Sequence, residues 1–140
     1  MRGYELAYMI AEKAFEKKKD LSGNPYMEHL ETVASGFPDN SEQKTVAILH
    51  DLLEDCPEWN EKSLRALFYD SIVNSIVALT KNDDELYTDY IHRVWKDNTA
   101  KRVKIADLKH NMDITRLNKI TDKDVCRLRK YLEAYKYLTK

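Results

Sequence analysis

The chain has 140 residues, of which 43% are hydrophobic, and this suits one domain over residues 1–140 with a single core. Lys and Arg number 23 against 24 Asp and Glu, so charge provides no overall attraction to nucleic acid or to a membrane surface. No apolar run approaches the roughly 20 residues that cross a bilayer, and residues 1–5 lack the apolar core of a signal peptide. Cys56 and Cys126 form no C-x-x-C pair, so we interpret both as free thiols in a reducing compartment. We therefore expect a soluble cytoplasmic protein that binds neither nucleic acid nor membranes.

Apolar residues in the first half of the chain recur at the spacings of amphipathic helices. They predict helices over residues 4–19, over residues 26–35, and from a cap near residue 41 to residue 55. Asn40 or Ser41 can cap the third of these helices. We expect it to stop after Asp55, because the residue before Pro57 is disfavoured in helical geometry. The basic run 17–19 suits the end of the first helix, and the alternative is a phosphate-binding role.

The second half of the chain is predicted to be helical as well. The spacing predicts helices near residues 64–68 and 72–79, and over residues 85–96, 99–113 and 122–139. The β-branched residues in 72–79 leave a strand open, but the absence of alternation favours a helix. We expect the last helix to turn its apolar residues, Val125 and Leu132 among them, toward the core. The fold class is therefore all-α, a compact helical bundle with short loops.

Polar residues interrupt the apolar run of the third predicted helix. Residues four apart lie one above the other on a helix face, so we expect His50 beside Glu54 and Asp51 beside Asp55. The flanking apolar residues would bury the rest of the helix, which brings this polar face close to the core. Burying three carboxylates together costs several kcal/mol per ion unless a cation or hydrogen bonds offset the cost. A bound metal ion is one remedy, and a structural or solvated role is the alternative.

The predicted helix over residues 99–113 has a second polar face. Asp107, His110 and Asn111 are spaced three and four apart, so they share one side of the helix. Lys104 precedes them by one turn, and we expect it to support the carboxylates electrostatically. His29 lies one step round from the apolar face of its own helix. A core histidine held by hydrogen bonds and a metal ligand are both compatible with that position.

Four blocks of the chain, taken in order, resemble one family of enzymes. They are Ser-Gly-Asn-Pro-Tyr-Met-Glu-His at 22–29, Leu-His-Asp-Leu-Leu-Glu-Asp at 49–55, Leu-Thr-Lys at 79–81 and Val-Lys-Ile-Ala-Asp-Leu-Lys-His-Asn-Met at 103–112. Together they are similar to the HD-domain phosphohydrolases of the RelA/SpoT type, the group that includes the single-domain small alarmone hydrolases. The resemblance implies an HD-type helical bundle that removes the 3′-pyrophosphate from guanosine tetra- or pentaphosphate.

The resemblance also implies roles for individual residues. One divalent metal ion, most often manganese in this family, would be held by His29, His50, Asp51 and Asp107. A set of two imidazoles and two carboxylates suits Mn, Fe, Zn or Mg better than a metal that prefers thiolates. The resemblance makes Glu54 and Asp55 the acidic pair that orients and deprotonates the attacking water. Its substrate contacts correspond to Ser22 and Asn111, with Lys19 the nearest cation in the first loop.

One loop departs from the family pattern. Relatives usually carry Arg-Lys before the Ser-Gly of the loop, and the arginine packs on guanine, whereas this chain has Asp20 and Leu21. Three hypotheses therefore stay open: a guanosine alarmone hydrolase, an HD-superfamily phosphohydrolase with a different nucleotide substrate, and a non-catalytic nucleotide-binding module. The sequence also leaves open a homo-oligomer with a subunit contact through Tyr87, Tyr90, Trp95 and the tyrosines of the last helix.

Overall fold

The computed structural model describes residues 3–140, and these are helical as predicted, apart from loops, turns and one isolated bridge between Lys19 and Pro25. The elements are α1 (Gly3–Ala14), α2 (Tyr26–Ala34), α3 (Glu42–Leu49), α4 (Leu52–Asp55), α5 (Glu61–Arg65), α6 (Asp70–Ala78), α7 (Tyr87–Trp95), α8 (Asn98–Asn111), the 3₁₀ turn η1 (Ile114–Arg116) and α9 (Asp122–Leu138). Within the described range, none of the helices has the length and apolar character needed to cross a bilayer. No signal-peptide core was predicted in residues 1–5. Of these, Met1 and Arg2 lie outside the described residues.

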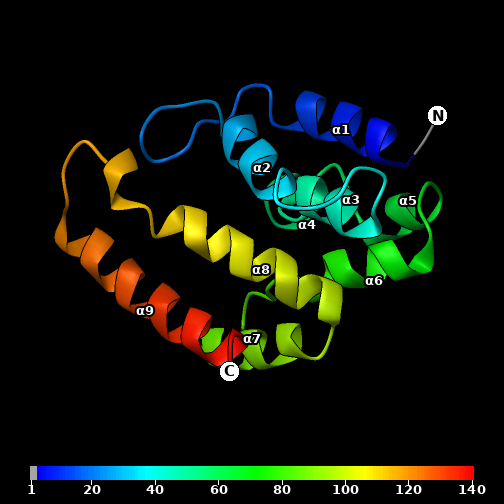
Figure 1. The fold of residues 1–140 in the computed structure, drawn as a ribbon. Helices are drawn as coiled ribbons and strands as arrows, with labels where there is room; N and C mark the ends of the chain where they lie inside the picture. The colour runs from blue at the N-terminus through cyan, green and yellow to red at the C-terminus, as the bar shows by residue number, and fades with distance from the viewer. Residues whose placement is uncertain (1–2) are drawn as a thin grey trace.

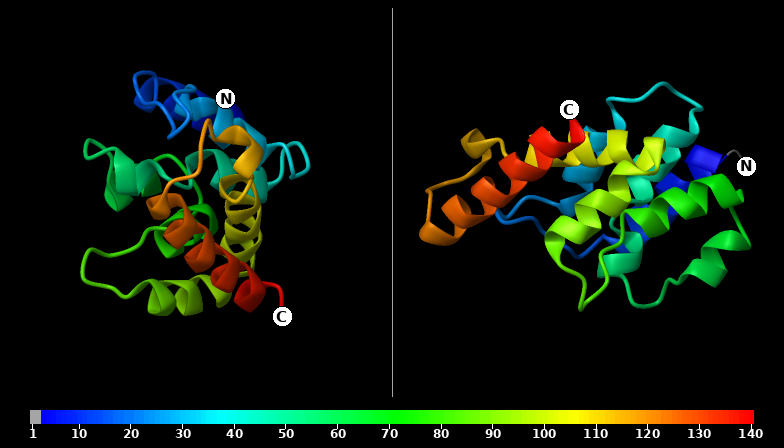
Figure 2. Two further views of the ribbon diagram at one scale, coloured as in Figure 1. Left: turned by 90° about the vertical axis from the view of Figure 1, so that its left-hand side faces the viewer. Right: turned by 90° about the horizontal axis from the view of Figure 1, so that it is seen from below.

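Helix α3 is the centre of the bundle. It contacts α1 and α2 on one part of its surface and α6 and α8 on another. All residues from Thr45 to Leu49 are buried, whereas a surface helix buries only one stripe. Helix α8 crosses the middle of the molecule with α9 beside it (Figure 1), and two further views show the same pairing (Figure 2). Polar residues that directly follow α3 therefore start from the interior.

The N-terminus of α3 is fixed by a side-chain cap. Ser41, one of the two predicted caps, accepts a hydrogen bond from the backbone N–H of Lys44 at its Oγ, at 3.1 Å. Asn40 precedes it with a φ of 64°, a left-handed conformation that asparagine adopts more readily than most residues. The cap starts the helix in a register that leads its C-terminal end into the core.

Ser41→Ala is expected to lower the free energy of unfolding by about 1 kcal/mol, because it leaves the N–H of Lys44 without its acceptor. For a domain of this size the melting temperature should fall by roughly 3 °C. Thermal unfolding followed by circular dichroism measures the effect. Ser35→Ala is the matched control, since the Ser35 hydroxyl donates to the Thr32 carbonyl and caps no N–H group. Equal melting temperatures for Ser41→Ala and the natural protein would contradict the prediction.

The first predicted helix is shorter than expected. Helix α1 ends at Ala14, not at Lys19, because Phe15 is buried and the chain turns there. The N–H of Lys18 donates to the carbonyl of Phe15 at 3.1 Å, and the N–H of Tyr26 donates to the carbonyl of Lys18 at 2.9 Å. Residues 17–19 therefore lie in a closed loop between α1 and α2, and the basic run does not cap a helix. Residues 72–79, for which the sequence left a strand open, lie mostly in helix α6, as favoured.

Candidate metal centre and adjoining cavity

Four side chains from three parts of the chain converge beneath the surface. They come from α2, from the junction between α3 and α4, and from α8, and they are His29, His50, Asp51 and Asp107. One nitrogen or oxygen atom of each lies within 4.8 Å of the corresponding atoms of the others. His29 Nε2 and His50 Nε2 lie 2.9 Å and 3.2 Å from Asp107 Oδ1. Two imidazoles and two carboxylates at this spacing could hold one divalent metal ion.

A break in the helix brings His50 and Asp51 to the same point. Helix α3 ends at Leu49, α4 begins at Leu52, and Asp51 has φ −100° and ψ 1°. In an unbroken helix, neighbouring residues point about 100° apart. Here His50 Nε2 lies 3.2 Å from Asp51 Oδ2, so both side chains face Asp107. The prediction of one continuous helix to Asp55 was wrong, although the helical segment does stop at Asp55.

Glu54 and Asp55, which were expected on one helix face with His50 and Asp51, have polar partners from other parts of the chain. Glu54 Oε1 accepts the backbone N–H of Lys81 at 2.6 Å, and Asp55 Oδ2 forms an ion pair with Lys18 Nζ at 2.9 Å. Lys18 thus places a positive charge beside the acidic C-terminal end of α4. Burial raises the pKa of Glu54 above its usual range, and the N–H of Lys81 only partly opposes this effect. A carboxyl with a raised pKa is suited to accepting a proton near neutral pH.

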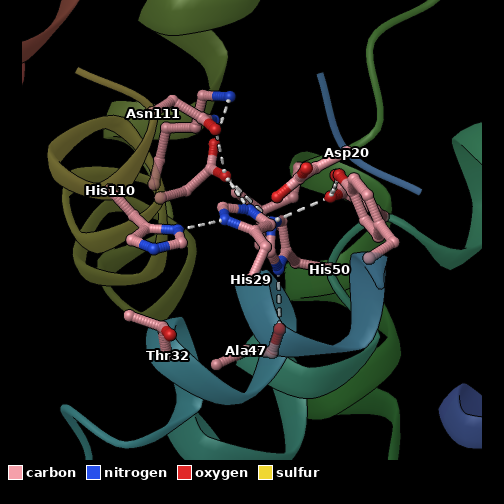
Figure 3. A network of polar contacts seen from close by, with 12 residues as sticks. Asp20, His29, Thr32, Ala47, His50, His110 and Asn111 are labelled. Carbon is pink, nitrogen blue, oxygen red and sulfur yellow. Dashed lines mark hydrogen bonds and ion pairs between the residues drawn. The ribbon is translucent and has the colours of Figure 1, made fainter. Parts of the chain in front are cut away.

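Hydrogen bonds to the far side of each imidazole orient the two histidines (Figure 3). His50 Nδ1 lies 2.6 Å from the carbonyl of Ala47. Because a carbonyl only accepts, His50 Nδ1 carries a proton, and Nε2 faces the carboxylates. His29 Nδ1 lies 2.6 Å from His110 Nδ1, and one of these two atoms carries the proton. Burial, with His29 and Arg116 nearby, lowers the pKa of His110 to about 4, so His110 is neutral at pH 7.

Opposite charges hold the buried carboxylates in place. Lys104 Nζ lies 3.0 Å from Asp107 Oδ2, as the expected supporting role requires. Burial raises the pKa of Asp107, but Lys104 and His50 outweigh burial and hold it well below its usual range. Burial lowers the pKa of His50, but Asp51 and Asp107 outweigh it and raise that pKa well above normal. Sequence reasoning missed Tyr26, whose hydroxyl donates to Asp51 Oδ2; no spacing rule indicated this contact.

A cavity of about 310 Å³ adjoins the cluster through His29 and Tyr26. The three residues predicted to bind substrate, Lys19, Ser22 and Asn111, all line it. Asn111 Nδ2 also donates to Asp107 Oδ1 at 3.1 Å, so Asn111 links the cavity to the cluster.

Polar contacts between Asp20, Ser22 and Arg116, here called the latch, line one side of this cavity. Arg116 forms an ion pair with Asp20 at 2.9 Å, and the Ser22 hydroxyl donates to the Arg116 carbonyl at 2.5 Å. Asp20 Oδ1 also accepts the N–H groups of Ser22 and Asn24, which shapes the loop. The latch joins the loop after α1 to the 3₁₀ turn after α8.

Some residues of the cavity wall were missed from the sequence. Arg116, Arg127 and Tyr131 line the cavity, yet no motif marked them. Arg127 and Tyr131 are four residues apart on a predicted helix, which placed them on one face. That spacing alone did not show which face meets the site.

Comparison with solved structures identifies the fold. No protein-family model matches the chain. The chain superimposes over 100% of its length on 86% of a metazoan orthologue of SpoT that hydrolyses ppGpp, with a TM-score of 0.77 and 16% identity. The chain has the fold of a SpoT-type hydrolase. The predicted all-α bundle is therefore confirmed, and the curated relatives described next confirm the predicted resemblance to the RelA/SpoT type.

Curated proteins that are similar to this chain are longer bacterial proteins. The guanosine-3′,5′-bis(diphosphate) 3′-pyrophosphohydrolase of Haemophilus influenzae is 30% identical over 118 aligned positions, and the match covers 74% of the chain. The bifunctional (p)ppGpp synthase/hydrolase SpoT of Escherichia coli is 28% identical over 120 aligned positions, and the match covers 76% of the chain. A GTP pyrophosphokinase of Streptomyces coelicolor is 29% identical over 147 aligned positions, or 96% of the chain. In each case the match spans only 17% of the relative's own length.

Proposed function

We propose that the chain is a metal-dependent hydrolase that removes the 3′-pyrophosphate from a guanosine alarmone, guanosine tetra- or pentaphosphate. The observation that carries this proposal is the convergence of two histidines and two aspartates within 4.8 Å beside a cavity of about 310 Å³. The names of the relatives from H. influenzae and E. coli, and the activity of the metazoan orthologue, support this choice of reaction.

We propose manganese as the metal, with His29, His50, Asp51 and Asp107 as its ligands. A divalent ion held there would lower the pKa of a water molecule and neutralise charge on a phosphate oxygen. The protein's own contribution is to fix the ligand atoms. Ala47 orients His50, and Lys104 and Asn111 hold Asp107, so the ligand set needs little rearrangement.

We propose Glu54 as the group that accepts the proton from the attacking water. Its Oε1 is held by the N–H of Lys81, while its Oε2 has no hydrogen-bond partner among residues 3–140. Asp55 assists by orienting the water, and its ion pair with Lys18 fixes its position. The water oxygen bonds to the phosphorus next to the ribose and one water proton passes to Glu54. The bond between that phosphorus and the ribose 3′-oxygen breaks, and the 3′-oxygen takes up a proton and leaves as the hydroxyl of the nucleotide product.

We propose that Lys19, Ser22 and Asn111 contact the nucleotide. Of the Lys and Arg residues that line the cavity, Lys18, Arg116 and Arg127 each form an ion pair with an aspartate. Lys19 forms no ion pair within the described residues. Lys19 is therefore available to a phosphate group. The Ser22 hydroxyl donates to Arg116, so Ser22 would meet the nucleotide as an acceptor.

A different nucleotide is the second candidate substrate, and the latch favours it. The Asp20 carboxylate already forms an ion pair with Arg116. The Leu21 side chain is 77% exposed, but it has no group that could hydrogen-bond to a base. The loop thus lacks the arginine that packs on guanine in the family that the sequence resembles. Hydrolysis of another nucleotide with a higher kcat/KM than the guanosine alarmone would establish this alternative. Nucleotide binding without any turnover would establish the third hypothesis, a non-catalytic module.

Release of pyrophosphate from guanosine tetraphosphate, measured with and without added Mn²⁺, tests the proposal. We expect turnover with Mn²⁺ and none after treatment with a chelator. A panel of other 3′- and 5′-phosphorylated nucleosides serves as the comparison. Absence of pyrophosphate release by the fully metal-loaded protein would reject the proposed reaction.

Metal binding is also expected to stabilise the fold. An ion that binds only the folded state adds about 2.7 kcal/mol when its concentration is 100 times Kd, so the melting temperature should rise by several degrees. Thermal unfolding with Mn²⁺, Mg²⁺, Zn²⁺ or chelator measures this shift. If none of these ions changes the melting temperature, the proposed metal site is wrong.

We also propose that the protein acts in the cytoplasm on a free nucleotide. Both cysteines are free thiols, Cys56 buried and Cys126 exposed, which suits a reducing compartment. A homo-oligomer is compatible with this proposal, and analytical ultracentrifugation measures the assembly state.

A further inference from the structure

A second cavity, of about 270 Å³, lies between α7 and the C-terminal half of α9. It shares no lining residue with the cavity beside the metal cluster. Its most buried lining residues are Ile91 and Ala134, which are 3% and 5% exposed. The proposed hydrolysis uses none of these residues.

Aromatic rings form much of the lining of this α7–α9 cavity. His92 and Tyr137 are stacked with ring centroids 4.5 Å apart and planes inclined by 6°. Tyr87 also lines the cavity, and Lys130 Nζ lies 4.5 Å from the centroid of its ring. Flat rings beside apolar side chains favour a planar aromatic guest.

Two polar groups near this cavity have no hydrogen-bond or ion-pair partner in the described structure. The Tyr87 hydroxyl is buried and makes no hydrogen bond to any residue of 3–140. Lys130 forms no ion pair with a carboxylate of the described residues, and its Nζ lies over the rings of Tyr87 and Tyr131. Burial, followed by the charges of Lys104, Lys81 and Arg127, lowers the pKa of Lys130. An anionic group beside Lys130 would relieve this positive charge.

Glu133 supplies the opposite charge on the same wall. It is exposed, lines the cavity and lies three residues after Lys130 on α9. Residues three apart are neighbours on a helix surface. The cavity therefore presents one cation and one anion next to each other above an apolar interior.

We propose that the α7–α9 cavity binds a small zwitterion that carries a planar aromatic ring, of which an aromatic α-amino acid is the simplest example. The ring packs against Ile91 and Ala134. The carboxylate of the ligand pairs with Lys130, and its ammonium group pairs with Glu133. The charge pattern selects this ligand over a simple anion, which Glu133 repels, and over a simple cation, which Lys130 repels.

Calorimetric titration with L-phenylalanine tests the proposal, and it needs no hydrolytic activity. We expect saturable binding with a dissociation constant on the order of 1 mM, as ligand efficiency allows for a molecule of this size. Two analogues separate the charges: 3-phenylpropanoate lacks the ammonium group, and phenethylamine lacks the carboxylate. The dissociation constant of each analogue should be at least about fivefold higher than that of phenylalanine, since each analogue leaves one charge of the cavity unpaired. Absence of saturable phenylalanine binding overturns the proposal, as does an analogue that binds as tightly as phenylalanine.

Three variants locate the site. Lys130→Gln is expected to weaken phenylalanine binding about tenfold by removing a charge-assisted contact. Lys136→Gln is the matched control, because Lys136 is exposed on the same helix and does not line the cavity. Thr88→Trp, at an exposed lining position, should fill the cavity and abolish binding without disturbing the core. Circular dichroism confirms that each variant is folded. Unchanged binding in Thr88→Trp, or equal weakening in the two lysine variants, overturns the proposal.

Discussion

Asp107→Asn is expected to abolish binding of Mn²⁺ and to destabilise the fold even without metal. Asp107 pairs with Lys104 at 3.0 Å, and the two side chains are 5% and 13% exposed. Removing one partner of such a buried pair costs about 3–5 kcal/mol, because the remaining charge stays buried. The melting temperature should fall by roughly 10 °C, and pyrophosphate release should be undetectable. Thermal unfolding, metal titration and the nucleotide assay give the three measurements.

A double variant separates the fold from the metal in this prediction. Replacing Lys104 by Met together with Asp107→Asn removes both charges, so much of the lost stability should return. Metal binding should not return, because a ligand atom is still missing. Asp84→Asn is the matched control, since Asp84 is exposed in the turn before α7. If Asp107→Asn binds Mn²⁺ with the affinity of the natural protein, Asp107 is not a ligand.

Glu54→Gln is expected to lower kcat by about 10²–10⁴-fold, the usual contribution of a general base. The amide oxygen can still accept the N–H of Lys81, so the fold and the Mn²⁺ affinity should be nearly unchanged. Steady-state pyrophosphate release and metal titration of the same preparation measure the two effects. The matched control is Glu58→Gln, because Glu58 is exposed beyond the end of α4. A kcat within about threefold of the natural value would remove Glu54 from the role of general base.

The acid limb of the pH profile provides a second readout for Glu54. Burial raises the pKa of this carboxyl, and a general base works only when it is deprotonated. Activity should therefore fall as the pH drops, with a midpoint above the usual glutamate range. The limb should disappear from the residual activity of Glu54→Gln. A profile of unchanged shape in the variant would assign the limb to another group.

Hydrophobic spacing predicted the helices well because the chain is organised around one buried helix. The strong apolar run before His50 became α3, and Ser41 capped it as expected. Spacing was less informative about orientation. Val125 and Leu132 were expected in the core, but they are 38% and 45% exposed. Helix α9 makes its main helix contacts with α7 and α8 only, so one apolar stripe is covered and a neighbouring one is not.

The candidate site could be predicted only in part, for a similar reason. His29, His50, Asp51 and Asp107 were named from three separated blocks, and the structure brings them together. The break that aims His50 and Asp51 at one point was not predicted, because i, i+4 reasoning assumes an unbroken helix. The latch between Asp20 and Arg116 was also missed, since it joins residues 96 positions apart. Such contacts depend on tertiary packing and leave no local pattern.

The position of α3 has a consequence for synthesis of the protein on the ribosome. Its residues Thr45–Leu49 are all buried, and part of their cover comes from α6 and α8, which emerge later. A nascent chain that ends before α8 thus exposes apolar surface that it has no means of covering. The domain is therefore expected to fold in one late step after α8 leaves the exit tunnel. Until then Asp107 cannot join the two histidines, so the four-residue cluster does not form on an unfinished chain.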